Sequence, residues 1–172
     1  MEQEEATVLP ADDENPPFDA EISLREITAE TVRAVMRLKV ASAQEHFVAP
    51  NANSIAEAHF SPERAWFNAI YANETPVGFV MLYDDPDAPT YFLWRFMIDQ
   101  RYQGRGYGTR ALRLLVEHVR ARPDATVLGV SYVPGDGSPE TFYKKFGFTD
   151  TGEMDEDEVI AQLLLEELPD ED

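Results

Sequence analysis

The segment of this chain whose residue types are best suited to chemistry is a glycine-rich loop over residues 103–108, with the sequence QGRGYG. It separates an apolar stretch typical of a central strand from a stretch with the periodicity of an amphipathic helix. In such a loop the backbone amides and the positive end of the helix dipole converge on one point. A tight turn alone requires one glycine, whereas this loop contains three. The loop therefore predicts an anion-binding site.

Arginines surround this loop. Five of them lie between residues 95 and 113, together with a single acid, Asp99, and such a setting suits a phosphate ester. The loop is not the phosphate-binding loop of kinases, because no lysine precedes Thr109. Nor is it the dinucleotide-binding fingerprint, whose third glycine would fall at Thr109. A strand-to-helix turn without a ligand is the alternative interpretation.

The composition excludes several other kinds of chemistry. The 172 residues contain no cysteine, which excludes disulfides, thiolate zinc sites and a cysteine nucleophile. The three histidines, His46, His59 and His118, have no metal-binding spacing, so we expect no metal site. No apolar run approaches the length of a membrane span. We therefore expect a cytoplasmic protein that has no membrane partner.

The charge is concentrated at the two ends of the chain. The formal net charge is −19, from 14 Lys and Arg against 33 Asp and Glu. Residues 1–21 hold eight acids and no base, and residues 150–172 hold eleven acids and no base. Such blocks usually serve solubility, and nucleic acid is not an expected partner because it requires a basic face.

The length is that of one domain. We expect an acidic, disordered leader over residues 1–20, a single folded domain over residues 21–166 and an acidic tail over residues 167–172.

Hydrophobic periodicity and turn residues predict the elements that position the loop. The expected strands cover residues 21–27, 66–72, 77–83, 91–98, 126–133, 148–151 and 159–165. The expected helices cover residues 28–40 and 54–60, the stretch between the glycine loop and Pro123, and residues 139–146. This order predicts an α/β fold in which a mixed sheet carries helices on both faces.

Residues 101–108 (RYQGRGYG) resemble the Q/R-x-x-G-x-G/A motif of the GNAT superfamily of acetyl-CoA-dependent N-acetyltransferases. The order of elements from about residue 21 to residue 166 is similar to the GNAT fold, a mixed, mostly antiparallel central sheet with helices on both faces. Residues 38–48 (LKVASAQEHFV) and 93–99 (LWRFMID) more narrowly resemble the bacterial spermine/spermidine acetyltransferase-like branch.

The resemblance implies transfer of an acetyl group to a primary amine of a small molecule, with a polyamine as the candidate acceptor. It implies that the amine attacks acetyl-CoA directly in a ternary complex. GNAT proteins often form homodimers, so a homodimer is also expected, although the sequence identifies no interface. Two alternatives stay open: an acyl-CoA-binding sensor module without turnover, and a protein or peptide N-acetyltransferase.

Acetyl-CoA is the implied cosubstrate, with its diphosphate on the loop amides and its pantetheine arm along the preceding strand. The expected contacts are Met97, Ile98, Asp99, Gln103, Gly104, Arg105, Gly106, Tyr107, Gly108 and Thr109. Before the next helix the family often has an asparagine, and the aligned residue here is Asp136. A carboxylate near CoA departs from the family pattern.

Residues 141–148 (TFYKKFGF) are similar to the family segment F/L-Y-x-x-x-G-F, whose tyrosine commonly protonates the departing thiolate. The resemblance therefore implies that Tyr143 is the catalytic acid. A phenol with a pKa near 10 stays protonated at neutral pH, whereas a thiol has a pKa near 8.5. Aromatic packing on a helix face is the alternative role for Tyr143.

The attacking amine must lose a proton, since an unperturbed pKa near 10.4 leaves only about one molecule in a thousand neutral at pH 7. Polyamine acetyltransferases often use a strand carboxylate here, but the aligned residue is Trp94. Glu45 is the candidate base, and a water relay is the alternative. Gln44, Phe47 and Trp94 are the candidate acceptor-binding residues.

Overall fold

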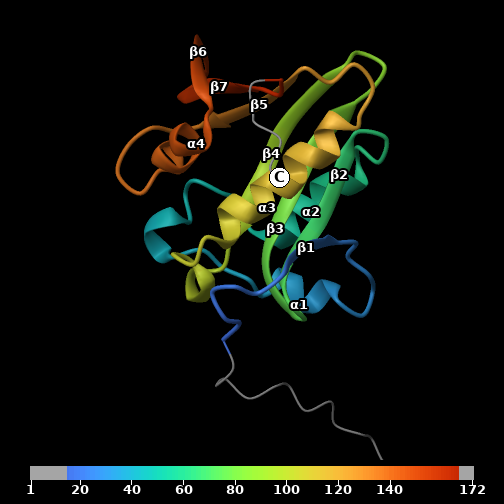
Figure 1. Ribbon diagram of the computed structural model, residues 1–172, viewed down its shortest axis with the longest axis vertical. Helices are drawn as coiled ribbons and strands as arrows, with labels where there is room; N and C mark the ends of the chain where they lie inside the picture. Colours follow the sequence, from blue (N-terminus) through green and yellow to red (C-terminus); the bar gives the residue numbers. More distant parts are fainter. Residues whose placement is uncertain (1–14, 167–172) are drawn as a thin grey trace, which may run out of the picture.

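The structure, a computed structural model, describes residues 15–166 of the chain. Within these residues seven strands form one sheet in the order β1-β2-β3-β4-β5-β7-β6 (Figure 1). All neighbours are antiparallel except β4 and β5, which are parallel. The strands are β1 Ile22–Arg25, β2 Ala65–Ala72, β3 Thr75–Asp85, β4 Thr90–Ile98, β5 Val127–Tyr132, β6 Thr149–Asp155 and β7 Glu158–Leu164. The predicted mixed, mostly antiparallel sheet is confirmed.

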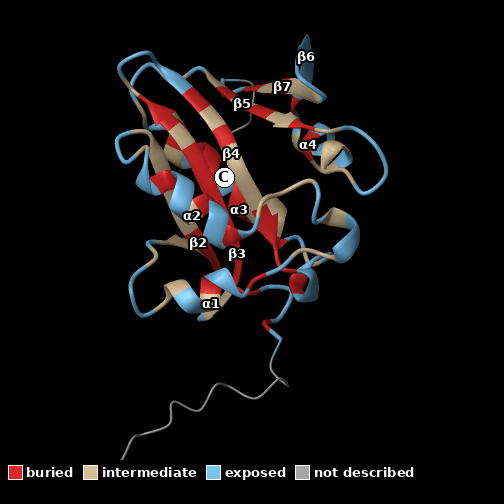
Figure 2. Ribbon diagram, turned by 180° about the vertical axis from the view of Figure 1, so that it is seen from behind, coloured by how far each residue is buried: buried red, intermediate tan, exposed pale blue. Residues whose placement is uncertain are grey.

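Helices cover both faces of this sheet, as predicted. They are α1 Val32–Met36, α2 Asn51–His59, α3 Tyr107–Arg120 and α4 Glu140–Phe146, with short 3₁₀ helices at Ser42–Gln44 and Gln100–Tyr102. In Figure 1 α3 lies in front of the sheet, and Figure 2 shows α2 on the opposite face. Alternation along the central strand β3 explains this layering. Phe79 and Met81 pack toward α1 and α2, whereas Val80 and Leu82 pack toward α3.

The two helices before β2 differ from their predicted bounds. The helix expected over residues 28–40 is limited to Val32–Met36. The preceding residues form a turn in which the Thr31 hydroxyl accepts a hydrogen bond from the Thr28 amide, and such local bonds compete with helix formation. The next helix, α2, begins at Asn51 directly after Pro50, whose φ of −53° is suited to a helix start.

The N-terminal segment of the described residues is fixed against the start of α3. The hydroxyl of Tyr107 lies 2.8 Å from the carbonyl oxygen of Pro16 and 2.7 Å from that of Pro17. Arg110 donates to the carbonyl oxygens of Phe18 and Ala20, both at 2.7 Å. The folded unit therefore begins before residue 21, where we expected it to start. The rest of the expected leader, residues 1–14, and the expected tail, residues 167–172, lie outside the described residues.

The sheet opens between β4 and β5. These strands pair only through Phe92 with Gly129 and Leu93 with Val130. On its other side β4 carries a bulge where it pairs with β3. Leu93 faces Leu82 and Arg95 faces Met81, so three residues of β4 lie opposite two residues of β3. Trp94 is thus the extra residue, and a bulge bends a strand and redirects its side chains. The edge of β4 beyond Leu93 is consequently free of β5.

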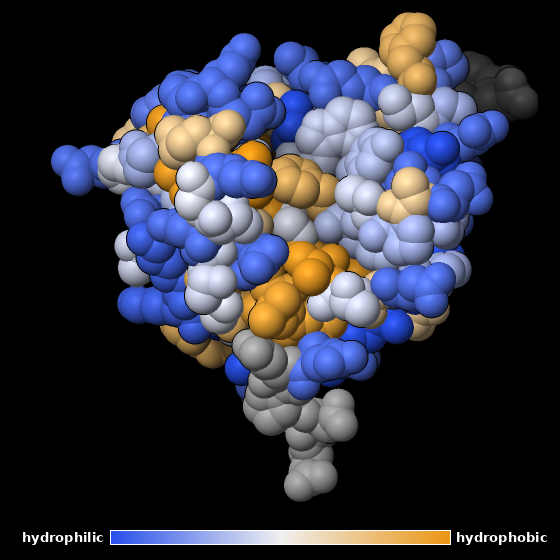
Figure 3. Space-filling model, turned by 90° about the horizontal axis from the view of Figure 1, so that it is seen from above, coloured by the Kyte–Doolittle hydropathy of each residue, from blue (hydrophilic) through white to orange (hydrophobic). Residues whose placement is uncertain are grey.

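The surface is largely polar on the face seen from above. In Figure 3 hydrophilic residues cover most of this face, and hydrophobic residues gather near its centre. Among the helices of residues 15–166, none has both the length and the apolar character needed to cross a membrane.

We predict that Tyr107→Phe lowers the free energy of unfolding by about 1–2 kcal/mol, because it removes a buried hydroxyl that serves the Pro16 and Pro17 carbonyl groups. Urea denaturation measures this change. Tyr71→Phe is the matched control, since Tyr71 is also a largely buried tyrosine, but its hydroxyl makes no hydrogen bond within the described residues. Equal stability of both variants and the unmodified protein would show that the N-terminal segment is not held through Tyr107.

Candidate active site

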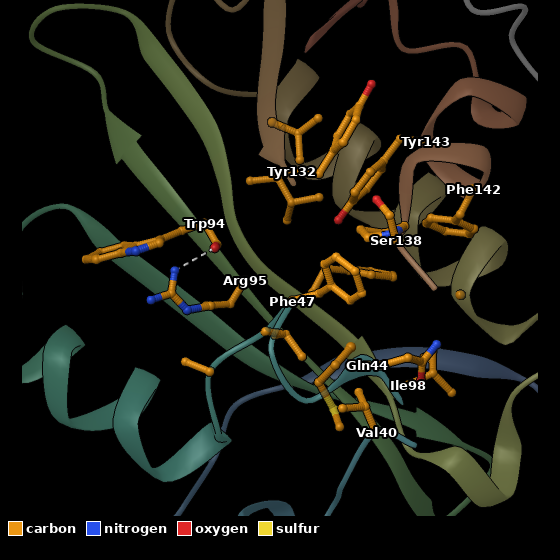
Figure 4. Close-up of a pocket in the computed structure, with 18 of the residues that line it drawn as sticks. Val40, Gln44, Phe47, Trp94, Arg95, Ile98, Tyr132, Ser138, Phe142 and Tyr143 are labelled. Atoms are coloured by element: carbon orange, nitrogen blue, oxygen red, sulfur yellow. Dashed lines mark hydrogen bonds between the residues drawn. The ribbon is translucent and has the colours of Figure 1, made fainter. Parts of the chain in front are cut away.

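A pocket of about 1090 Å³ lies where β4 and β5 separate. Its wall comes from β4, the loop that follows β4, the start of α3, the end of β5, α4, and the segment between α1 and α2. The pocket therefore joins the glycine loop to the helix that carries Tyr143. Figure 4 shows labelled side chains of β4, β5, α4 and the segment between α1 and α2 around this pocket.

The glycine loop presents bare backbone to this pocket. Gly104 and Gly106 have φ values of +75° and +76°, a region that side chains with a Cβ rarely adopt. A Cβ added at either position would meet nothing within 4 Å, so the space beside the loop is open. Gly106 is also the N-cap of α3, a 14-residue helix whose first amides have no partner within the helix. This geometry fits an anionic group such as a diphosphate.

Three of the arginines nearest the loop, Arg101, Arg105 and Arg110, do not line the pocket. Arg105 donates to the Pro16 carbonyl oxygen at 2.9 Å, and its guanidinium lies over the Phe18 ring. Arg110 is bonded to the same N-terminal segment. Arg101 pairs with Asp99 at 2.9 Å. These arginines therefore lie near the loop, but their side chains bind backbone carbonyl groups of the protein and the Asp99 carboxylate.

The Asp99 side chain holds the start of the loop through hydrogen bonds. Its carboxylate is buried and accepts hydrogen bonds at 2.9 Å from the Lys39 amide and from the amide and side chain of Arg101. Burial alone would raise the pKa of Asp99, but these hydrogen bonds outweigh that effect and hold the pKa below its ordinary value. The side chain of Asp99 therefore fixes the end of β4 and does not face the pocket.

Two glutamines connect the loop to the opposite wall. The Gln103 side-chain amide donates to the Ile98 carbonyl oxygen and to Gln44 Oε1, both at 2.9 Å. The same oxygen of Gln44 accepts from the Ala41 amide at 3.1 Å. Gln44 lines the pocket, as the prediction requires, but its carbonyl oxygen is already used to position the wall.

Tyr143 lies inside an aromatic cluster at the pocket. Its ring centroid is 6.0 Å from that of Tyr132, 5.4 Å from that of Phe142 and 5.4 Å from that of Phe148. Its hydroxyl makes no hydrogen bond within the described residues, and Figure 4 shows it directed into the pocket toward Phe47. Burial raises the pKa of Tyr143 above its ordinary value, so the phenol stays protonated.

Tyr132 lines the same pocket, but its hydroxyl points the other way (Figure 4). It donates to Asp150 Oδ1 at 2.7 Å. Burial first, and then the Asp150 carboxylate, raise the pKa of Tyr132. Of these two tyrosines, Tyr143 alone presents its hydroxyl to the pocket.

The chain belongs to the GNAT acetyltransferase family. This follows from the Acetyltransferase (GNAT) family profile, which matches residues 32–148 and so includes the glycine loop, the open edge of β4 and Tyr143. Members are N-acetyltransferases that use acetyl-CoA as the donor.

Known GNAT proteins resemble this chain at low sequence identity. The spermine/spermidine N(1)-acetyltransferase of Bacillus subtilis is 24% identical over 140 residues, which cover 78% of this chain and 91% of that protein. The L-2,4-diaminobutyric acid acetyltransferase of Streptomyces avermitilis is 26% identical over 99 residues, covering 57% and 55%. The crystal structure of the PaiA N-acetyltransferase of Thermoplasma acidophilum in complex with coenzyme A has a TM-score of 0.63 at 18% identity, covering 84% of this chain and 99% of that one.

Of the remaining predicted site residues of this GNAT chain, some line the pocket and one does not. Phe47 and Trp94 line the pocket, and Glu45 lies at its exposed rim. Asp136 is exposed and is not part of the pocket wall, although its neighbour Gly137 is. No group of three or more His, Asp and Glu side chains with the arrangement of metal ligands occurs in the part of the chain that the structure describes.

Sequence reasoning missed one carboxylate of the GNAT pocket. Glu158, at the start of β7, lines the pocket and accepts a hydrogen bond from the Ser131 hydroxyl at 2.9 Å. In the sequence it belongs to the acidic C-terminal block. Only the pairing of β5 with β7 brings it beside Ser131, and a single sequence does not specify that pairing.

Proposed function

We propose that this GNAT protein transfers the acetyl group of acetyl-CoA to a primary amine of a small molecule, by direct attack in a ternary complex. The observation that carries the proposal is that the bare glycine loop and the Tyr143 hydroxyl line one pocket. Relatives named for polyamine and diaminobutyrate acetylation support a small amine as the acceptor.

The residues present fit acetyl-CoA. The amides of residues 103–109 and the start of α3 would hold the diphosphate. The edge of β4 at Met97 and Ile98 would pair with the extended pantetheine arm, because β5 does not occupy that edge. Asp99 and Arg105 would contribute through their backbone, since their side chains have other partners. Bound acetyl-CoA supplies a thioester carbonyl that an amine can attack.

Tyr143 would hold the proton that the leaving thiolate needs. Its hydroxyl faces the pocket, and burial keeps its pKa high enough for the phenol to remain protonated until a strong base forms beside it. The surrounding rings of Phe142 and Phe148 fix its direction.

Two carboxylates line the pocket and can accept the amine proton, directly or through water. Glu45, the residue proposed from the sequence, is exposed at the rim. Glu158, at the start of β7, accepts a hydrogen bond from the Ser131 hydroxyl. Both favour an acceptor that brings a positively charged group into the pocket.

The function is tested by incubating the purified protein with acetyl-CoA and a panel of polyamines, diamino acids, aminoglycosides and N-terminal peptides. We expect release of the CoA thiol with at least one small primary amine. Release with peptides alone would identify a protein N-acetyltransferase. Tight acetyl-CoA binding without thiol release across the whole panel would instead indicate a CoA-binding sensor module.

Tyr143→Phe should lower kcat by about 10²-fold while leaving the Kd for acetyl-CoA nearly unchanged, because only the acidic proton is removed. Steady-state kinetics and calorimetry measure the two quantities. Tyr132→Phe is the matched control, since its hydroxyl is bonded to Asp150, and we expect it to retain turnover. An unchanged kcat in Tyr143→Phe would exclude the acid role.

Gly106→Ala should raise the Kd for CoA about tenfold, because the added methyl group enters the open space beside the loop and the positive φ is strained for alanine. Calorimetric titration with CoA measures this. Gly152→Ala is the control, as it carries a similar φ of +85° and equally open space outside the pocket. If both variants bind CoA like the unmodified protein, the loop does not hold the diphosphate.

A further inference from the structure

Arg95 is placed on the pocket wall by the bulge in β4. Without a bulge, consecutive residues of a strand face opposite sides of the sheet. The extra residue at Trp94 turns both Trp94 and Arg95 toward the face of α2. Figure 4 shows the two side chains together at the end of the pocket away from Phe142 and Tyr143. A strand rises about 3.3 Å per residue, so Arg95 lies roughly 10 Å along β4 from Ile98.

Arg95 supplies the pocket's only guanidinium or ammonium group among the described residues. The arginines closest to the glycine loop are directed at the N-terminal segment or at Asp99. A positive charge thus stands on the acceptor side of the pocket, remote from the loop proposed for the diphosphate. A ligand with only positive charges would be repelled there.

The guanidinium of Arg95 has unused donor capacity. Nη1 donates to the Trp94 carbonyl oxygen at 3.0 Å, and Nη2 donates to Glu57 Oε2 at 3.2 Å. Its Nε is buried and makes no hydrogen bond within the described residues. Glu57 itself is half exposed, which weakens that ion pair. Nη1 and Nη2 each keep a second N–H group, and these groups can donate charge-assisted hydrogen bonds to a carboxylate.

We propose that the acceptor carries a carboxylate besides its reacting amine, and that Arg95 binds this carboxylate. The inference rests on the proposed acetyl transfer and specifies its substrate class, namely amino acids with a primary amine. The two acids of the pocket, Glu45 and Glu158, suit the ammonium group of such a molecule, and Arg95 suits its opposite charge. A polyamine has ammonium groups that suit Glu45 and Glu158, but it has no carboxylate for Arg95 to bind.

Matched substrate pairs test this. Ornithine and putrescine differ by one carboxylate, as do lysine and cadaverine. We expect kcat/KM for the amino acid of each pair to exceed that for its diamine roughly tenfold or more, as expected for one charge-assisted pair. Equal or faster acetylation of the diamines overturns the inference. This measurement uses the unmodified protein and does not depend on a variant folding.

Variants of the ion pair separate substrate binding from support of the fold. Arg95→Gln should bring the ratio within each pair close to one by raising KM for the amino acid, while the diamine rate changes little. Arg95→Lys should restore part of the preference. Glu57→Gln removes the partner and should preserve the preference. If Arg95→Gln and Glu57→Gln lower stability and both substrate rates alike, Arg95 is a structural residue and the inference is overturned.

These experiments distinguish a wrong role for Arg95 from a wrong proposed function. Acetylation of other amines in the panel, with no preference for carboxylates in either pair, refutes the assignment of Arg95 but leaves acetyl transfer intact. Absence of turnover with every amine refutes the proposed function itself, and the substrate inference with it.

Discussion

The short contact between β4 and β5 is the constraint on which the site depends. Two residue pairs join these strands, and beyond Leu93 they separate. The bulge at Trp94 bends β4 at the same level. A sheet that continued its pairing here would bury the edge of β4 and leave no pocket. The opening is bridged instead by side chains, including the stack of Phe96 of β4 on Phe142 of α4, with ring centroids 5.8 Å apart.

The glycine loop depends on two supports outside the pocket. Below it, Asp99 collects hydrogen bonds from Lys39 and Arg101, which joins the end of β4 to the chain after α1. Beside it, Arg105 and Arg110 satisfy carbonyl groups of the N-terminal segment. The charge near the loop is therefore part of the framework, and the loop can attract an anion mainly through its own amides and the helix that follows.

Much of this was predictable from local sequence. The strands, the loop and α3 carry patterns of apolar residues and glycines that specify them locally, and the motif around Tyr143 located a side chain that does face the pocket. Non-local contacts were not predictable. The local sequence around Arg105 does not predict that its side chain donates to the Pro16 carbonyl oxygen. Glu158 reaches the pocket only through the pairing of β5 and β7.

The open edge of β4 also links the binding of a ligand in the pocket to the stability of the fold. An extended molecule lying along Met97 and Ile98 would supply hydrogen bonds that β5 does not make there, and it would contact the two halves of the divided sheet at once. Any ligand that binds the folded state alone raises the free energy of unfolding with its concentration. The donor substrate would then act as a removable eighth strand, and heat resistance in a crude extract would report how much of the protein is loaded.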